Sequence, residues 1–109
     1  MAVTQSQSIQ SASVPQIAVG RYLDDGTAAV ITITTGFTPR YVHIINNASS
    51  DELEWVEGMA AASGLKRVAG GTGSAITTLG ITQASNGFTI GLDTDINVSN
   101  EQLSWIALG

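Results

Sequence analysis

The chain has 109 residues, enough for one domain with a real core but too few to enclose a large active site. Its net charge is −5, with only Arg21, Arg40, Lys66 and Arg67 positive, which argues against direct nucleic-acid binding because that requires several cations. Charged residues make up 12% of the chain, and this low share suits a protein that rests against other protein surfaces.

The sequence contains no cysteine, which excludes disulfides and thiolate metal sites. Its N-terminus does not show the pattern of a signal peptide, and no apolar run is long enough to cross a bilayer. We therefore expect no membrane partner and a cytoplasmic location before any assembly.

Residues 1–14 are polar, uncharged and without a periodic apolar pattern. Such a segment cannot bury enough apolar surface to offset the entropy lost on ordering. Two interpretations stay open: a disordered tail, or an arm that orders only against a neighbouring subunit. The expected organisation is an N-terminal arm at residues 1–14 and a single β domain at residues 15–109.

The first half of the domain predicts short strands separated by turns. Residues 16–23 are apolar enough for a strand, and Asp24-Asp25-Gly26-Thr27 carries the Asp-Gly signal of a hairpin. Residues 29–34 alternate apolar and hydroxyl side chains, which predicts a half-buried strand. After a turn at residues 35–39, residues 41–46 form a near-continuous apolar run that we expect to be covered on both faces.

Residues 51–62 fit two structures by local rules. Ser49 and Glu52 make a plausible helix capping box, whereas a period of two places Leu53 and Trp55 on one face of a strand. The Leu-x-Trp motif recurs at Leu103 and Trp105, where the apolar run is too short for a helix. We therefore predict a strand at residues 52–56, followed by a turn near residues 59–63.

Turn signals also divide the second half. Gly70-Gly71-Thr72-Gly73 predicts a loop between two strands of a hairpin, at residues 65–69 and 74–79. Asn86-Gly87 is a strong turn signal, a further turn lies at residues 93–97, and the chain ends in a last strand. The predicted fold is all-β, a compact antiparallel β-sandwich or small barrel of about seven to nine strands with an extended N-terminal arm.

The candidate chemical groups fit structural roles better than catalysis. His43 is the only histidine, so one chain cannot build a Ser-His-Asp triad or a two-histidine metal site, and we interpret it as a hydrogen-bonded core or interface residue. Asp93-x-Asp95-x-Asn97 looks locally like a calcium loop but lacks the glycine and glutamate of an EF-hand, so turn formation is the preferred interpretation.

Three other groups have both a functional and a structural interpretation. An acidic set could supply the pair of catalytic carboxylates of a glycosidase, but we prefer to interpret it as a solvated face or a subunit contact. We interpret Lys66-Arg67 as a solvated or salt-bridged pair. Trp55 and Trp105 could stack on a sugar, but tryptophans flanked by aliphatic residues are more often core. The acidic set consists of Asp51, Glu52, Glu54 and Glu57. We predict no catalytic, cofactor-binding or metal-binding residues and no enzymatic activity.

Three motifs over roughly residues 36–108 resemble a family of small structural proteins of tailed bacteriophages. They are Arg40-Tyr41-Val42-His43-Ile44-Ile45-Asn46-Asn47, Glu54-Trp55-Val56-Glu57-Gly58-Met59, and Gly80-Ile81-Thr82 followed by Gly87-Phe88-Thr89-Ile90-Gly91. The resemblance implies a virion structural protein, most simply a capsid decoration (cement) protein that binds the outside of the major capsid protein lattice and forms a homo-oligomer, with a trimer favoured. The alternative is a fibre, spike or tail-associated domain that binds a host-surface glycan.

Overall fold

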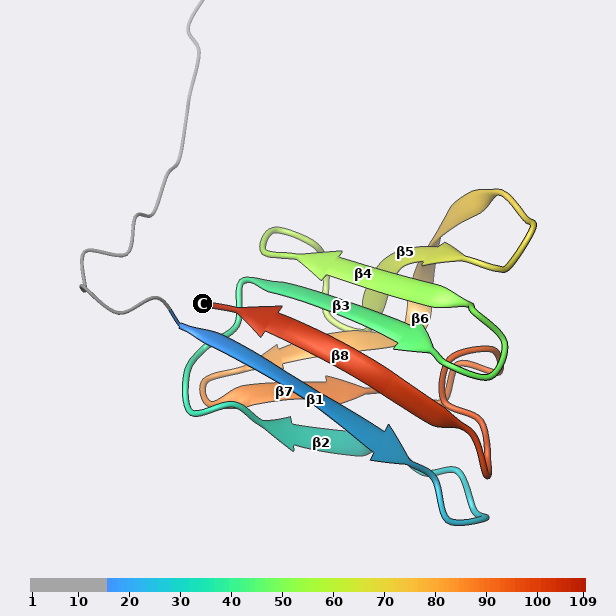
Figure 1. The fold of residues 1–109 in the computed structure, drawn as a ribbon. Helices are drawn as coiled ribbons and strands as arrows, with labels where there is room; N and C mark the ends of the chain where they lie inside the picture. Colours follow the sequence, from blue (N-terminus) through green and yellow to red (C-terminus); the bar gives the residue numbers. More distant parts are fainter. Residues whose placement is uncertain (1–15) are drawn as a thin grey trace, which may run out of the picture.

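The computed structural model describes residues 16–109, which form one antiparallel sheet of eight strands (Figure 1). The order across the sheet is β1-β8-β3-β4-β5-β6-β7-β2. This confirms the predicted all-β class, whereas the arm predicted at residues 1–14 lies outside the described residues. The strands are β1 (Ile17–Leu23), β2 (Ile31–Thr34), β3 (Tyr41–Asn46), β4 (Glu52–Val56), β5 (Ser63–Arg67), β6 (Gly73–Ala84), β7 (Gly87–Ile90) and β8 (Gln102–Leu108).

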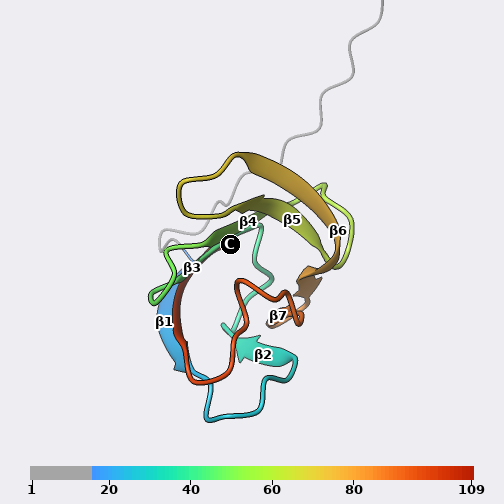
Figure 2. The same cartoon turned by 90° about the vertical axis from the view of Figure 1, so that its right-hand side faces the viewer.

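The sheet curls into a half-barrel that encloses one core (Figure 2). The connection between β7 and β8, residues 91–101, runs inside the curve and contributes Ile96 to the core. The concave inner face of this sheet holds the core, and no second layer formed by residues 16–109 covers its convex outer face. The buried hydrophobic residues are Ile31, Val42, Ile44, Leu53, Trp55, Ile81, Phe88, Ile90, Ile96, Leu103 and Ala107.

Strand β3 shows how the single layer divides its side chains. Val42 and Ile44 are fully buried on the inner face, whereas Tyr41, His43 and Ile45 alternate with them on the outer face and are only half-buried. The prediction that this run is covered on both faces is therefore wrong. Among the described residues, its outer side chains have their lateral neighbours on β4 and β8.

Strand β4 confirms the choice of strand over helix for residues 52–56. Leu53 and Trp55 point into the core with 0% and 2% of their surface exposed, and Glu52 and Glu54 point outward. The indole Nε1 of Trp55 donates a hydrogen bond to the carbonyl of Ala60 at 3.3 Å. The turn that follows β4 thus satisfies the one polar atom that the buried indole carries.

The Asp-Gly turn after β1 forms, but it does not make the predicted hairpin. The Asp24 side chain accepts a hydrogen bond from the backbone N–H of Gly26 at 3.1 Å. Beyond that turn the chain crosses to the opposite end of the sheet, where β2 pairs with β7, while β1 pairs with β8. Strands β1 and β2 are therefore the two edges of the half-barrel.

The predicted hairpins in the second half of the chain are confirmed, with one change. Strands β5 and β6 pair around the glycine-rich loop, and β6 pairs with β7 across Ser85 and Asn86. The difference is that β6 is one long strand, which continues past a register shift opposite Ser63 and Gly64 and a positive φ of 62° at Leu79. This bend lets β6 pair with both neighbours as the sheet curls.

Candidate binding surface on the outer face of the sheet

An apolar row crosses four neighbouring strands on the outer face. The register places Ile17 of β1 beside Leu108 of β8, Leu108 beside Tyr41 of β3, and Tyr41 beside Val56 of β4. The next row begins with Val19 and Ile106 before it reaches His43. We call the six apolar residues of these rows the outer-face patch: Ile17, Val19, Tyr41, Val56, Ile106 and Leu108.

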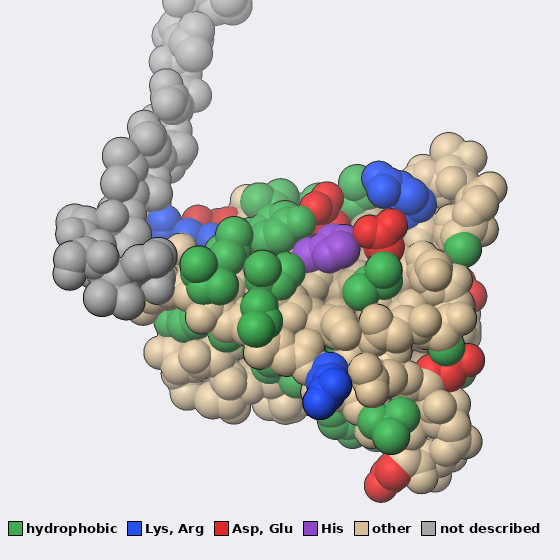
Figure 3. All heavy atoms as spheres, in the orientation of Figure 1, with side chains coloured by type: hydrophobic (Ala, Val, Ile, Leu, Met, Phe, Trp, Pro, Cys, Tyr) green, Lys and Arg blue, Asp and Glu red, His purple; other side chains and the backbone are tan. Residues whose placement is uncertain are grey.

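The outer-face patch is open to solvent at both ends. Val19 is 70% exposed, Ile17 57% and Val56 46%. Figure 3 shows hydrophobic side chains gathered on this face beside the single histidine. Because single exposed apolar residues are ordinary but contiguous ones mark interaction sites, the patch is the surface of this molecule best suited to contact a partner.

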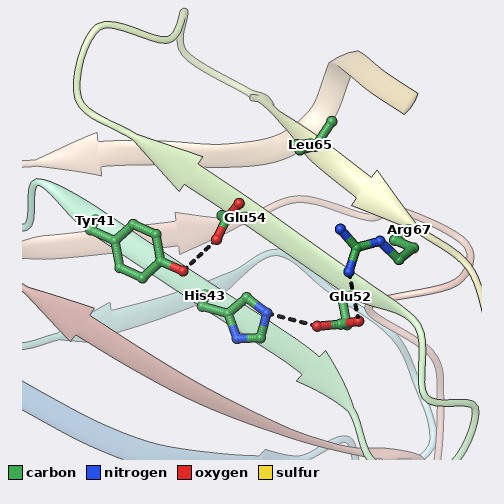
Figure 4. A pocket seen from close by; sticks show the side chains of 6 residues that line it. All are labelled: Tyr41, His43, Glu52, Glu54, Leu65 and Arg67. Atoms are coloured by element: carbon green, nitrogen blue, oxygen red, sulfur yellow. Dashed lines mark hydrogen bonds and ion pairs between the residues drawn. The ribbon is translucent and has the colours of Figure 1, made fainter. Parts of the chain in front are cut away.

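A shallow groove of about 130 Å³ borders the patch on the outer face of β3, β4 and β5. Figure 4 shows its lining, in which the Tyr41 hydroxyl donates a hydrogen bond to Glu54. His43 Nε2 lies 3.0 Å from Glu52 Oε1, and the guanidinium of Arg67 lies 3.6 Å from the other oxygen of Glu52. The polar groups of the groove therefore pair with one another.

Electrostatics keep Tyr41 neutral. Burial, the hydrogen bond to Glu54 and the negative charges of Glu54 and Glu52 raise the pKa of Tyr41 to about 12. A raised pKa disfavours the phenolate, so Tyr41 acts in this groove as a hydrogen-bond donor. Among residues 16–109, no group of three or more His, Cys, Asp or Glu side chains is arranged to hold a metal ion.

The acidic set singled out in the sequence does not stay together. Glu52 and Glu54 line the groove, but Asp51 is buried and accepts a hydrogen bond from the backbone N–H of Ala69 at 2.8 Å. Glu57 lies at the surface, 3.9 Å from Arg40. Asp51 therefore holds a loop from a buried position and departs from the predicted solvated face, whereas Glu52, Glu54 and Glu57 lie on the outer surface.

The calcium-like motif forms a turn and binds a lysine. Asp93 Oδ1 accepts hydrogen bonds from the backbone N–H groups of Asp95 and Ile96 at 2.9 and 3.2 Å. Lys66 Nζ lies 2.9 Å from Asp93 and 2.6 Å from Asp95, so the preferred interpretation as a turn and a salt-bridged lysine is confirmed. Burial lowers the pKa of Lys66, but the hydrogen bonds and charges of the two aspartates outweigh it, and the net shift is upward.

The two tryptophans differ in burial. Trp55 is a core residue, as predicted, whereas Trp105 is only partly buried, although it also points inward. The Trp105 ring meets Phe88 edge to face, with centroids 5.5 Å apart, and lies over Gly20 of β1. Neither ring therefore forms a flat platform on the outer face.

Two features escaped the sequence. Asn46 is fully buried, and its amide nitrogen donates to the carbonyls of Asp95 and Ile96, so it anchors the β7–β8 connection from β3. An asparagine that closes an apolar run was the available signal. The outer-face patch gave no signal, because Ile17 and Leu108 lie at opposite ends of the sequence.

Searches of protein-family models, of curated proteins and of solved structures found no match to this chain. Residues 16–109 include no helix of the length and apolar character needed to span a membrane.

Proposed function

We propose that this protein is a bacteriophage capsid decoration protein, which binds the outside of the major capsid protein lattice and stabilises the shell without catalysing a reaction. The observation that carries the proposal is the outer-face patch, a contiguous apolar surface on a molecule with few charges. The resemblance of the Tyr41–Asn46 and Gly87–Ile90 segments to small virion proteins supplies the setting.

The outer-face patch is suited to a protein partner. Apolar surface gains free energy on burial, roughly 25 cal/mol per Å², and a contact free of charges avoids the cost of stripping water from ions. The groove beside it adds hydrogen-bonding groups at the rim, where Glu52 and Arg67 remain in contact with water. An apolar centre with a polar rim is the usual anatomy of a specific protein interface.

Binding stabilises the shell by mass action. A protein that binds one shell state stabilises it by RT ln(1 + [L]/Kd), about 2.7 kcal/mol per site at a concentration one hundred times the dissociation constant. Binding both shell states equally would shift nothing, so we expect preference for the mature, expanded capsid. Because the chain has only four cations, this affinity should depend weakly on salt.

The test is to strip the protein from virions, add it back, and follow shell melting and genome release. Wild type is expected to raise the melting temperature of the saturated shell. Val56→Asp, which places a charge in the outer-face patch, should need a higher concentration for the same effect. Val30→Asp is the matched control, because Val30 is also an exposed valine, at 57% against 46% for Val56, and lies in the connection between β1 and β2.

The outcomes separate the proposal from its alternative. No change in shell melting at saturation, or equal loss of binding in both variants, would contradict the proposal. Binding to a host-surface glycan would instead support a fibre, spike or tail-associated domain. We prefer decoration because neither of the tryptophans that could stack on a sugar presents its ring on the outer face, since Trp55 is buried and Trp105 points inward.

The oligomeric state belongs to the same proposal. Capsid lattices offer three-fold positions, so a homotrimer assembled on the shell at these positions is the arrangement that the resemblance favours. The copy number relative to the major capsid protein in purified virions measures this directly, since decoration requires many copies and a fibre only a few.

A further inference from the structure

We propose that two copies of this chain pair through the unpartnered edge of β1, in antiparallel register about a two-fold axis at Gly20. The pairing would join the two half-barrels into one continuous sheet. It stands apart from shell binding, because it requires only the protein itself.

The free edge of β1 is defined by its pairing with β8. The backbone N–H of Gly109 donates to the backbone carbonyl of Gln16 at 2.8 Å, and the backbone N–H of Asp24 donates to the backbone carbonyl of Glu101 at 3.4 Å. In an antiparallel ladder, alternate residues bond to the same neighbour, so Ala18, Gly20 and Tyr22 also bond to β8. The N–H and C=O groups of the intervening residues point away from β8: Ile17, Val19, Arg21 and Leu23.

No described strand pairs with that edge, since β1 is the first in the sheet order. Ile17, Val19 and Leu23 are 57%, 70% and 62% exposed. Soluble proteins usually protect such an edge with a proline, a lysine or a bulge. Strand β1 has no proline, lysine or bulge, its one charged residue is Arg21, and its pairing with β8 is regular over seven residues.

One antiparallel register of the two β1 strands pairs every backbone N–H and C=O group that points away from β8. With Gly20 opposite its own copy, Ile17 faces Leu23 and Val19 faces Arg21, and each of these positions points its backbone groups at the other chain. Four residue pairs with two hydrogen bonds each then bring together all the outward N–H and C=O groups of both strands. A shift by two residues leaves one outward residue of each copy without a partner.

The charge on β1 permits the pairing. All nine carboxylates of the chain lie outside β1, so the negative net charge of the molecule is not concentrated at this edge. Arg21 lies opposite Val19 and diagonal to the Arg21 of the other copy. That diagonal repulsion adds to the general repulsion between two chains of net charge −5, and salt should therefore strengthen the pairing.

The surface area that two β1 edges bury limits the affinity of the pair. A strand of seven residues is roughly 23 Å long, and with a sheet about 10 Å thick its edge covers roughly 230 Å² per copy. A stable complex of two free proteins needs roughly 1,000 Å² in total, about twice what the two edges bury. The pair should therefore be weak in free solution and form at high local concentration.

The geometry also places the two outer-face patches on the same side. Antiparallel strands in one sheet are related by a two-fold axis perpendicular to it, so both convex faces point the same way. Val19 and Ile17, which are the edge of one patch, then lie beside the other copy of β1. The pair presents two patches to a single surface.

Hydrogen exchange by NMR on the full-length chain, over a concentration series, tests the register. The amides of Val19 and Arg21 should gain protection as concentration rises, whereas those of Ala18, Gly20 and Tyr22 should be protected throughout. The alternating gain would support the pairing. Protection of Val19 and Arg21 that does not change with concentration would overturn it, because the edge would then be occupied within one chain.

Sedimentation equilibrium of two proline variants tests the edge. Val19→Pro removes an outward N–H without breaking a bond to β8, and two lost bonds per pair should raise the dissociation constant roughly tenfold or more. Thr32→Pro is the matched control, because the Thr35 N–H bonds to Asn86 and the alternation directs the Thr32 N–H away from β7. It should leave the dissociation constant unchanged.

Several results would overturn the proposal. One is a free protein that remains monomeric to the order of 1 mM in high salt. The second is a free protein that forms a trimer at saturation, and the third is equal association of Val19→Pro and wild type. If Val19→Pro does not fold, the exchange pattern of the wild-type protein decides alone.

Discussion

The ion pairs of Lys66 should be a large single contribution to stability that can be tested without touching the apolar core. Lys66 leaves β5 on the inner side of the sheet and meets Asp93 and Asp95 in the connection that runs inside the half-barrel. The side chains of Lys66 and Asp93 are 14% and 9% exposed, whereas that of Asp95 is 42% exposed. The replacement Lys66→Met keeps most of the volume and removes the charge.

The expected cost follows from which carboxylate is left behind. Removing one partner of a buried ion pair costs about 3–5 kcal/mol because the other charge stays desolvated. Asp95 can be solvated when Lys66 is lost, but Asp93 cannot, so we expect about 3 kcal/mol. Since each kcal/mol shifts the melting temperature of a domain this size by about 4–8 °C, Lys66→Met should lower it by more than about 10 °C.

Urea denaturation followed by tryptophan fluorescence measures the loss, with Arg67→Met as the matched control. Arg67 is the next residue on β5, but its side chain is 61% exposed, so its ion pair with Glu52 should contribute less than about 1 kcal/mol. Adding Asp93→Asn removes the stranded charge and keeps the Oδ1 acceptor of the turn, so the double variant should recover most of the loss. A cost below about 0.5 kcal/mol for Lys66→Met, or no recovery in the double variant, would refute the reasoning.

Three further predictions concern the fold, and urea denaturation measures each. Trp55→Ala should cost about 3–5 kcal/mol of unfolding free energy because the Trp55 ring is 2% exposed. Trp105→Ala should cost less because that ring is only partly buried, and a larger cost for Trp105→Ala than for Trp55→Ala would contradict the burial of the two rings. Gly20→Ala should cost about 1–3 kcal/mol, since its Cβ would lie 2.6 Å from the Trp105 ring, and a neutral effect would show that the ring moves freely. Stability should fall as the pH rises above 10, because the folded state keeps protons that the unfolded state loses. The pKa of Tyr41 is raised from 10.0 to about 12 in the folded state, and the pKa of Lys66 is also raised. Tyr41→Phe should reduce this alkaline loss of stability, and an unchanged loss in that variant would contradict the prediction.

Local patterns in the sequence predicted individual strands better than strand neighbours. The alternation at residues 52–56 identified β4, and the Asn86-Gly87 signal located the β6–β7 hairpin, because both depend on residues close in the chain. The Asp-Gly turn after β1 looked the same locally, yet β1 pairs with β8 and β2 with β7. Those pairings are decided by which strands complete the core, and a turn signal does not contain that information.

The candidate surface was even less predictable. Tyr41, His43 and Ile45 alternate with the core residues of β3, and they lie on an open face because residues 16–109 form no second layer over it. The tripeptide Gly-Phe-Thr occurs at residues 36–38 and again at residues 87–89, in two different structures. Phe37 lies in the connection between β2 and β3, whereas Phe88 is a core residue of β7. The same short motif therefore does not predict whether its phenylalanine lies in a strand or in a connection.

The pairing of β1 with β8 has a consequence for how the chain folds. The first strand of the described sheet has its only neighbour in the last, and β3 also needs β8 on one side. On the ribosome, β1 therefore waits without a partner until residues 102–108 have emerged. Contacts so distant in sequence make folding slow, with times in the range of milliseconds to seconds for all-β domains. During that interval Ile17, Val19 and Leu23 have no ladder on either side, so the interval between synthesis and closure of the sheet is when this chain is most exposed to misassociation.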